Sequence, residues 1–261
     1  MSTASPIDVS GTFGLDGRIA VVTGASSGLG DRFARELHAA GAHDVVAARR
    51  HDRLQQLVAE LGERATEVAA DLTLAEDRVA LIEVATAIGG GVDVLVNNAG
   101  RSEPAPAEDE TVEHFVDTMD LNVVAPFHLS QLAATSMLAA GRGSIVNIAS
   151  ILGMVASAPM KDASYCASKG AVVNLTRQLG CEWGRKGVRV NAIAPGWFPS
   201  EMTQADMFDD DKGADFVSRN TPMGRPGTLD ELDGALLFLA SDASTYVTGQ
   251  ILAVDGGWTA R

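Results

Sequence analysis

Tyr165, Lys169 and Ser150 are the residues whose types and spacing could do chemistry. A tyrosine has an ordinary pKa of about 10, so it acts as a base near neutral pH only where its surroundings stabilise the phenolate. Lys169 follows Tyr165 by four residues in a segment predicted to be helical over 163–182, which places both side chains on one helix face. At roughly 4 Å and an effective dielectric of about 20, their attraction is at most about 4 kcal/mol. The pair therefore predicts a tyrosine that exchanges protons near neutral pH.

Ser150 ends the run Gly-Ser-Ile-Val-Asn-Ile-Ala-Ser, which is typical of a buried strand. Ligands of open α/β sheets bind beyond the carboxyl ends of the strands, so the Ser150 hydroxyl can hydrogen-bond a substrate oxygen there. On its own, Tyr-x-x-x-Lys would more often be an ordinary helical pair, and the neighbouring strand is what favours a site. Ser157 is an alternative hydroxyl, but no strand positions it, so Ser150 is preferred.

The elements that must position these residues form an alternating strand and helix pattern. This alternation predicts an α/β protein with a single-domain Rossmann fold, that is, a doubly wound, seven-stranded parallel sheet with helices on both faces. Residues 1–14 are expected to be a flexible N-terminal extension, and residues 15–261 one dinucleotide-binding catalytic domain. The predicted strands are 18–23, 45–48, 66–70, 92–96, 144–148, 188–193 and 251–254.

A Gly-rich turn follows the first predicted strand. Gly24, Gly28 and Gly30 give the pattern G-x-x-x-G-x-G, which differs from the common fingerprint G-x-G-x-x-G but allows the same tight turn. The backbone there can approach a pyrophosphate, and amides at the start of the next helix can bind it. Such a turn could serve chain reversal alone, but the strand before it and the helix after it favour a dinucleotide. The other residues predicted to line this phosphate site are Ser26, Ser27 and Leu29.

The end of the second predicted strand should decide between the two nicotinamide cofactors. An acidic residue there would bind the 2′-hydroxyl of the adenosine ribose in NAD. This chain has Ala48 instead, followed by Arg49 and Arg50, and Arg49 could bind a 2′-phosphate through two parallel hydrogen bonds. NADP(H) is therefore favoured. NAD(H) is the alternative if the arginines are solvated or cover the adenine.

Five segments of the chain resemble, in the same order, those of the classical short-chain dehydrogenases/reductases, and the resemblance extends over residues 15–258. It implies an oxidoreductase that transfers a hydride between NADP(H), or NAD(H), and a secondary alcohol or ketone, with Tyr165 as general acid and base. Ser150 and Lys169 would complete the catalytic set with Asn122, which would hold a water that links Lys169 to solvent. By spacing alone, Asn122 would be a buried, satisfied amide. The five segments are 23–30, 97–100, Ser150, 165–169 and 195–196.

The same resemblance implies further cofactor contacts, with Tyr165 and Lys169 beside the nicotinamide ribose. Asp71 and Leu72 would meet the adenine, although an aspartate at such a position is more often a helix N-cap. After the sixth predicted strand, the backbone of Phe198 and the hydroxyl of Ser200 would contact the nicotinamide carboxamide. The remaining implied contacts are Asn98, Ala99 and Gly100, which could otherwise form only a turn, and Pro195 and Gly196.

The substrate side of the site is less determined by sequence. Residues 200–222 are predicted to form a lid over the substrate, and the acidic run 209–211 a solvated surface. The connection 151–164 is longer than in many relatives of the family it resembles, which indicates a small insertion at the substrate mouth. An apolar pocket with scattered polar groups would fit many secondary alcohols, so the sequence does not identify the substrate.

Two other functions could use the same scaffold. A halohydrin-type lyase keeps the serine and tyrosine, but it resembles a variant with arginine at the position of Lys169 and a remodelled Gly-rich loop. A catalytically silent dinucleotide-binding protein would be expected to lack Ser150, Tyr165 or Lys169. This chain has all three and the glycines, so an oxidoreductase is preferred.

Composition excludes several partners. A net charge of −14 over 261 residues argues against a nucleic-acid surface or an anionic membrane, and favours a soluble protein whose copies repel one another. The small-molecule alcohol or ketone substrate is what the resemblance implies. No signal-peptide pattern and no apolar run of ~18 residues is present, so a cytoplasmic location is expected. Cys166 and Cys181 would lie about 22 Å apart on one helix, too far for a disulfide. No metal site is predicted. The resemblance implies a homotetramer, a dimer of dimers, paired through helices near 112–138 and 163–184 and through the C-terminal strand.

Overall fold

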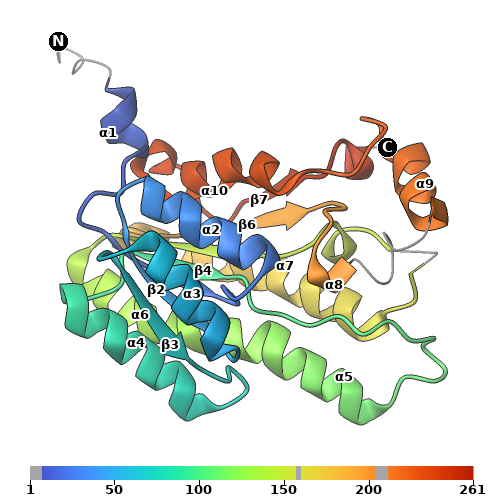
Figure 1. Cartoon of the computed structure of the whole chain (residues 1–261), viewed down its shortest axis with the longest axis horizontal. Coiled ribbons are helices and arrows are strands. Elements are labelled where there is room, and N and C mark those ends of the chain that lie inside the picture. Colours follow the sequence, from blue (N-terminus) through green and yellow to red (C-terminus); the bar gives the residue numbers. More distant parts are fainter. Residues whose placement is uncertain (1–7, 157–159, 204–210, 261) are drawn as a thin grey trace.

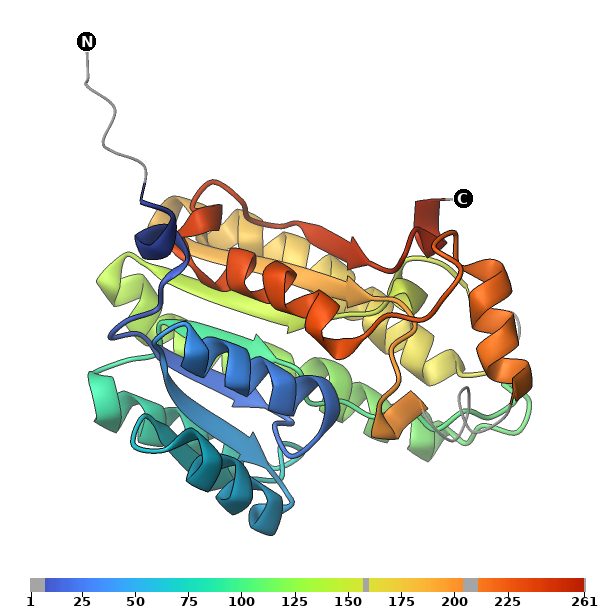
Figure 2. The same cartoon turned by 45° about the horizontal axis from the view of Figure 1, so that its top comes forward.

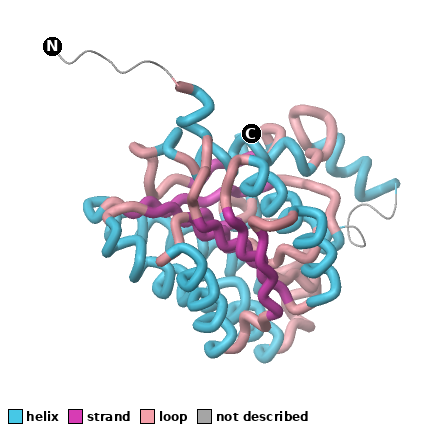
Figure 3. Tube along the Cα trace, turned by 60° about the vertical axis from the view of Figure 1, so that its left-hand side comes forward, coloured by secondary structure: helices cyan, strands magenta, loops and turns pink. Residues whose placement is uncertain are grey.

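Seven parallel strands form one sheet in the order β3-β2-β1-β4-β5-β6-β7. The structure is a computed structural model and describes residues 8–156, 160–203 and 211–260. Figure 3 shows the strands as a twisted band with helices on both sides, which confirms the predicted doubly wound Rossmann fold. The strands are β1 (Ile19–Thr23), β2 (His43–Ala48), β3 (Ala65–Ala69), β4 (Val94–Asn97), β5 (Gly143–Ile148), β6 (Val188–Pro195) and β7 (Ile251–Val254).

All seven predicted strands are present, although some of their ends differ. β2 begins at His43, two residues before the predicted start, and includes Asp44, which is fully buried. A hydrophobicity pattern does not predict a buried carboxylate, and here His38 supplies a partner with its Nδ1 atom 3.1 Å from Asp44 Oδ2. β6 continues two residues beyond its predicted end, to Pro195, so the strand itself carries the start of the predicted nicotinamide segment.

Helices cover both faces of the sheet (Figures 1 and 2). On one face, Phe33, Leu54 and Leu236 belong to a single buried cluster with the strands. On the other face, Leu81 and Leu129 belong to a second cluster. Apolar contact on both faces explains why the strands are hydrophobic throughout. The first face carries α2 (Gly28–Ala39), α3 (His51–Leu61) and α10 (Asp233–Ala240), and the second carries α4 (Ala75–Gly89), α6 (Ala125–Ala140) and α7 (Ala163–Trp183).

The long helix predicted over 112–138 consists of three consecutive segments. These are α5 (Val112–Met119), a π-helical turn (Asp120–Val124) and α6. Among the described residues, the run Val112–Ala140 is long and apolar enough, by length and composition alone, to cross a membrane. Leu129, Ala133 and Met137 of α6 pack into the core beneath the sheet, so in this fold the run is one of the covering layers.

The predicted extension and lid are partly helical. In the extension, α1 (Val9–Phe13) is a short helix capped by Asp8, whose Oδ1 accepts the Gly11 amide at 3.0 Å. In the lid, α8 (Glu201–Thr203) and α9 (Asp211–Asn220) flank residues 204–210, which lie outside the described residues, as does Ser157. Cys166 and Cys181 are both free. The short 3-10 helices are η2 (Ile151–Gly153), η3 (Gly184–Lys186), η5 (Leu229–Leu232), η6 (Asp242–Ser244) and η7 (Trp258–Ala260).

Candidate active site

One cavity at the carboxyl ends of the strands brings the predicted site together. Its volume is about 660 Å³, within the usual range for small-molecule sites. It opens beside β1, which has β2 on one side and β4 on the other, at the point where the strand order reverses. Every residue predicted to contact the cofactor lines this cavity, and so does Ser150. Asn122 does not line it and lies behind the wall.

The Gly-rich turn leaves room for a phosphate. Gly24 has φ +69°, and a side chain there would come within 2.8 Å of the Asn98 amide nitrogen. A Cβ on Gly30 would overlap the carbonyl oxygen of Gly24, so α2 can start against the turn only with glycine at this position. Ser27, the N-cap of α2, makes no side-chain hydrogen bond to the helix. The first amides of α2 therefore stay available for an anion, and the turn fits a pyrophosphate.

The segment predicted to line the adenosine side also supports the turn. The Asn98 side chain donates to the Thr23 carbonyl at 2.8 Å. The amides of Asn98 and Ala99 both donate to Thr23 Oγ1 at 3.0 Å. Asn97 is buried and donates to Asn147 Oδ1 at 2.9 Å, which links β4 to β5. These contacts make the segment a structural tie between neighbouring strands as well as part of the cavity wall.

Tyr165 and Lys169 lie on the same side of α7, as the four-residue spacing predicts. The Lys169 Nζ atom is 5.5 Å from the centre of the Tyr165 ring. It donates to the Ile148 carbonyl at the end of β5, with an N to O distance of 2.8 Å. Ser150 follows two residues later and caps η2, because its Oγ accepts the Leu152 amide at 3.1 Å. The strand end and the helix thus present the three side chains to one cavity.

Burial changes the pKa of both charged partners. It raises the pKa of the Tyr165 phenol to about 12, although the neighbouring Ser150 hydroxyl favours the phenolate, and the Asp162 carboxylate adds to the rise. Burial also lowers the pKa of the Lys169 ammonium to about 8. The structure therefore differs from the prediction of a tyrosine acidified by Lys169. The reason is that loss of hydration disfavours the charged form of each group, and the ammonium is directed at the Ile148 carbonyl.

Asn122 sits in the π-helical turn and is 1% exposed. Its Nδ2 donates to the Arg101 carbonyl at 2.9 Å and to Ser168 Oγ at 3.0 Å, and its Oδ1 accepts the Arg101 amide at 2.9 Å. A buried amide with these partners is satisfied, as spacing alone predicts. It also ties the π-helical turn to α7 one residue before Lys169. A water held by Asn122 stays a prediction.

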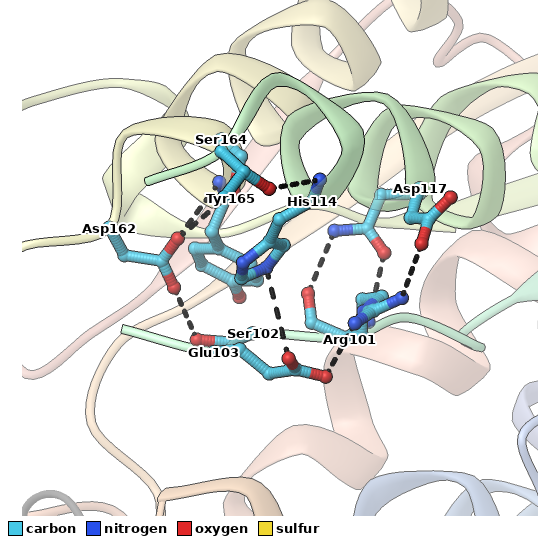
Figure 4. Close-up of polar contacts among 10 residues, drawn as sticks. Arg101, Ser102, Glu103, His114, Asp117, Asp162, Ser164 and Tyr165 are labelled. Carbon is cyan, nitrogen blue, oxygen red and sulfur yellow. Dashed lines mark hydrogen bonds and ion pairs between the residues drawn. The ribbon is translucent and has the colours of Figure 1, made fainter. Parts of the chain in front are cut away.

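A polar network that the sequence does not reveal surrounds Tyr165 (Figure 4). Asp162 is 4% exposed, and its Oδ1 accepts the Tyr165 amide at 3.1 Å as the N-cap of α7. Its Oδ2 accepts the Ser102 hydroxyl at 2.6 Å. Arg101 donates to Glu103 Oε1, also at 2.6 Å. Asp162 therefore joins the start of α7 to the polar wall of the cavity.

The predicted adenosine end of the cavity carries two arginines with different contacts. Arg50 donates to Ser26 Oγ at 3.1 Å and to Ser27 Oγ at 2.6 Å. Among the described residues, Arg49 makes no hydrogen bond or ion pair, although it helps to lower the pKa of Asp71. Asp71 is not a helix N-cap here, because its Oδ1 accepts the amide and hydroxyl of Thr73 at 3.0 and 2.8 Å in a local turn.

The predicted nicotinamide end is held by Thr203. Its hydroxyl donates to the Phe198 carbonyl at 2.7 Å and accepts the Ser200 amide at 3.0 Å. The backbone of Phe198 was predicted to meet the carboxamide, and its carbonyl has a partner within the chain. Sequence reasoning missed Thr203 even though it follows the Pro-Gly segment closely. The other cavity-lining residues that it missed are Ala48, Ala70, Thr73, Arg101, Ser102, Glu103, Leu121, Ile148, Ala149 and Glu201.

Comparisons with known proteins agree with this geometry. The sequence matches the family described as Enoyl-(Acyl carrier protein) reductase over residues 24–259. Gluconate 5-dehydrogenase of Gluconobacter oxydans (strain 621H) is 40% identical over 253 residues, which cover 95% of this chain and 96% of that protein. Galactitol 2-dehydrogenase (L-tagatose-forming) of Cereibacter sphaeroides is 42% identical over 254 residues, which cover 97% of this chain and 99% of that protein.

A solved structure is similar over the whole fold. The crystal structure of a gluconate 5-dehydrogenase from Burkholderia cenocepacia J2315 in complex with NADP and tartrate has a TM-score of 0.91 and 37% identity, and covers 97% of this chain and 100% of that chain. The fold and the cavity define a dinucleotide-dependent oxidoreductase. The chain belongs to the classical short-chain dehydrogenase/reductase family, and NADP(H) is its favoured cofactor.

Proposed function

We propose that this enzyme catalyses reversible hydride transfer between NADP(H) and a secondary alcohol or ketone, with Tyr165 as the proton donor and acceptor. The observation that carries the proposal is the placement of Ser150, Tyr165 and Lys169 in the wall of the cavity that the Gly-rich turn also lines. A group that holds the substrate oxygen thus lies beside a proton donor and next to a dinucleotide site. That combination is what alcohol and carbonyl redox chemistry needs.

Each side chain has one task in the proposed reaction. When bound, NADP(H) supplies or accepts the hydride. In the reduction of a ketone, Tyr165 donates its phenolic proton to the oxygen of the new alkoxide, while the Ser150 hydroxyl donates a hydrogen bond to the same oxygen. In the oxidation of an alcohol, the Tyr165 phenolate takes the hydroxyl proton. Lys169 would hold the hydroxyls of the nicotinamide ribose, and Asn122 fixes the backbone of Arg101 in the cavity wall.

The substrate class we propose is an open-chain polyhydroxylated molecule, either a sugar acid or an alditol. Two relatives carry names for reactions on gluconate and on galactitol. The cavity wall next to Tyr165 is polar, with Arg101, Ser102 and Glu103 in sequence. Such a wall matches successive hydroxyl groups better than an apolar ring. A comparison of kcat/KM for gluconate, galactitol and cyclohexanol tests this class, and a preference for cyclohexanol would contradict it.

The reaction assignment is tested with Tyr165→Phe. We expect this variant to bind NADPH like the wild type and to lose turnover by about 10²- to 10⁴-fold, the usual contribution of a general acid and base. Tyr246→Phe is the matched control, because Tyr246 is fully exposed on the surface at 103% of its reference area. NADPH fluorescence measures binding and absorbance of the reduced cofactor measures turnover. Wild-type turnover in Tyr165→Phe would refute the role of Tyr165.

We also propose that the enzyme assembles as a homotetramer in the cytoplasm. Val112, Phe115 and Val116 on α5, and Val124 and Phe127 further along the same helical run, are all exposed. Two turns of an α-helix take about seven residues, and a π-helical turn adds one more. Val116 and Val124, which are eight residues apart across that turn, therefore lie on the same side of the helical run. β7 pairs with β6 on one side and is the edge strand of the described sheet on the other, and Leu252 on it is exposed. Both surfaces suit contacts between copies of the chain.

A further inference from the structure

An ion-pair cluster joins α8 to the start of α3. The Glu201 carboxylate accepts a hydrogen bond from Arg50 through Oε2 at 2.8 Å and another from Arg53 through Oε1. Arg50 reaches further, to the hydroxyls of Ser26 and Ser27 in the Gly-rich turn. One carboxylate of α8 thus pairs with two arginines at the cavity mouth and leaves the cluster with a net positive charge.

The cluster lies where the adenosine end of a dinucleotide belongs. Arg50 follows β2 by two residues, and Arg50, Ser26 and Glu201 line the same cavity. Ser200, just before α8, lies close to the Gly-rich turn, since a Cβ placed on Gly28 would lie 3.5 Å from Ser200 Cβ. A phosphate on the 2′-oxygen of the adenosine ribose would therefore approach the Arg50 guanidinium, which already binds the Glu201 carboxylate.

We propose that Glu201 is a specificity-determining residue that competes with the 2′-phosphate of NADP(H) for Arg50 and Arg53. The inference rests on the proposed function only for which end of the cavity holds the adenosine, and it does not depend on the chemistry of Tyr165. NAD(H) has a hydroxyl at this position and leaves the cluster intact. NADP(H) must displace the Glu201 carboxylate before its 2′-phosphate can bind these arginines. The enzyme therefore prefers NADP(H) over NAD(H) less strongly than it would without Glu201.

The charges and exposures favour exchange. A phosphate monoester carries about −1.5 to −2 charges near neutral pH and three acceptor oxygens, against one charge on a carboxylate, so it is the better ligand for a guanidinium. The side chains of Glu201, Arg50 and Arg53 are 53%, 42% and 44% exposed, and ion pairs this exposed are weak. The two arginines lower the pKa of Glu201 to about 2, with Arg53 the larger contributor, so the competing carboxylate is ionised throughout the working range of pH.

The test measures the Kd of NADPH and of NADH for the full-length protein by cofactor fluorescence, without substrate. We expect Glu201→Gln to lower the Kd of NADPH by about threefold to tenfold, because two exposed ion pairs that compete with the phosphate are lost. The Kd of NADH should change by less than about twofold. Glu60→Gln is the matched control. Glu60 pairs with Arg35 at 2.7 Å on the surface of α3, so this variant makes the same change in net charge outside the cavity. We expect the ratio of its Kd values for NADPH and NADH to match that of the wild type.

Two further results decide the inference. In the background of Arg50→Gln, the gain from Glu201→Gln should shrink, because one of the contested arginines is gone. Raising the salt concentration should reduce the gain as well, since exposed charges are screened. An unchanged or weakened NADPH affinity in Glu201→Gln would overturn the competition. If the wild type bound neither nucleotide, the proposed function would fail instead, so the two failures are distinguishable.

Discussion

At the scale of single residues, the site depends on what surrounds Tyr165 more than on its one charged neighbour. Burial opposes the phenolate, Ser150 favours it, and the carboxylate of Asp162 opposes it again. Asp162 also holds the Tyr165 amide and the Ser102 hydroxyl, so one buried carboxylate fixes the start of α7 and adds to the rise in the pKa of Tyr165 that burial causes. A protonated tyrosine is ready to act as the acid in carbonyl reduction.

These shifts give different pH dependences for the two directions of the reaction. The pKa of Tyr165 is raised to about 12, so the phenolate fraction grows about tenfold per pH unit below that value. We expect kcat/KM for alcohol oxidation to rise with pH between about 6 and 9. Ketone reduction uses the protonated phenol, which dominates over this range of pH, so kcat/KM for reduction should not rise. An oxidation rate that is independent of pH would contradict the role of Tyr165 as base.

Asp162→Asn tests the contribution of the buried carboxylate. Removing its charge should lower the pKa of Tyr165 and move the oxidation profile to lower pH, because Asp162 is one of the groups that raise this pKa. Asp117→Asn is the control with the same change in charge. Asp117 is 66% exposed and lies 3.8 Å from Arg101. A purely structural role for Asp162 would lower activity equally at every pH and leave the profile in place.

At the scale of elements, three junctions position the chemistry. β1 passes through the Gly-rich turn into α2, β5 ends at Ser150, and α7 begins at the Asp162 cap. The π-helical turn between α5 and α6 adds a fourth constraint, because Asn122 in that turn binds both Arg101 and Ser168. The side chains of the candidate site therefore come from several elements whose ends meet at one edge of the sheet.

Gly30→Ala tests the junction between β1 and α2. The new Cβ would overlap the Gly24 carbonyl and come within 2.6 Å of the Asn98 amide nitrogen. Such crowding should cost about 1–3 kcal/mol of the free energy of unfolding and weaken NADPH binding. Gly234→Ala is the control, since nothing lies within 4 Å of a Cβ there in the first turn of α10. We expect that variant to gain up to ~1 kcal/mol. Denaturant unfolding measures both, and equal stabilities would contradict the close approach.

At the scale of the whole molecule, the sheet brings together strand ends that are far apart in sequence. The apolar surface that remains exposed outside the core is what we expect to determine assembly. The exposed stripe on α5 and α6 runs along the outside of a layer whose other side is core. A chain with net charge −14 repels its copies at long range, so association needs apolar contact of this kind. The stripe is the surface on which the proposed tetramer depends.

Val116→Glu tests the assembly. We expect it to shift the protein toward smaller species in sedimentation velocity, because a charge would be buried in the interface without a partner. Val9→Glu is the control, since Val9 is 65% exposed and Val116 57%, and the substitution is identical. A wild-type sedimentation coefficient for Val116→Glu would place the interface elsewhere.

The amino-acid sequence alone determined the seven parallel strands, the Gly-rich turn and the shared helix face of Tyr165 and Lys169. These features depend on neighbours within a few residues, so hydrophobic runs, glycine spacing and helical periodicity predict them. Only the tertiary structure decided that Asp162 binds Ser102, that Glu201 forms an ion pair with Arg50, and that burial raises the pKa of Tyr165. Glu201 and Arg50 are 151 positions apart, and no local pattern records that they meet. Packing brings such groups together and removes their water, and both effects are properties of the folded molecule.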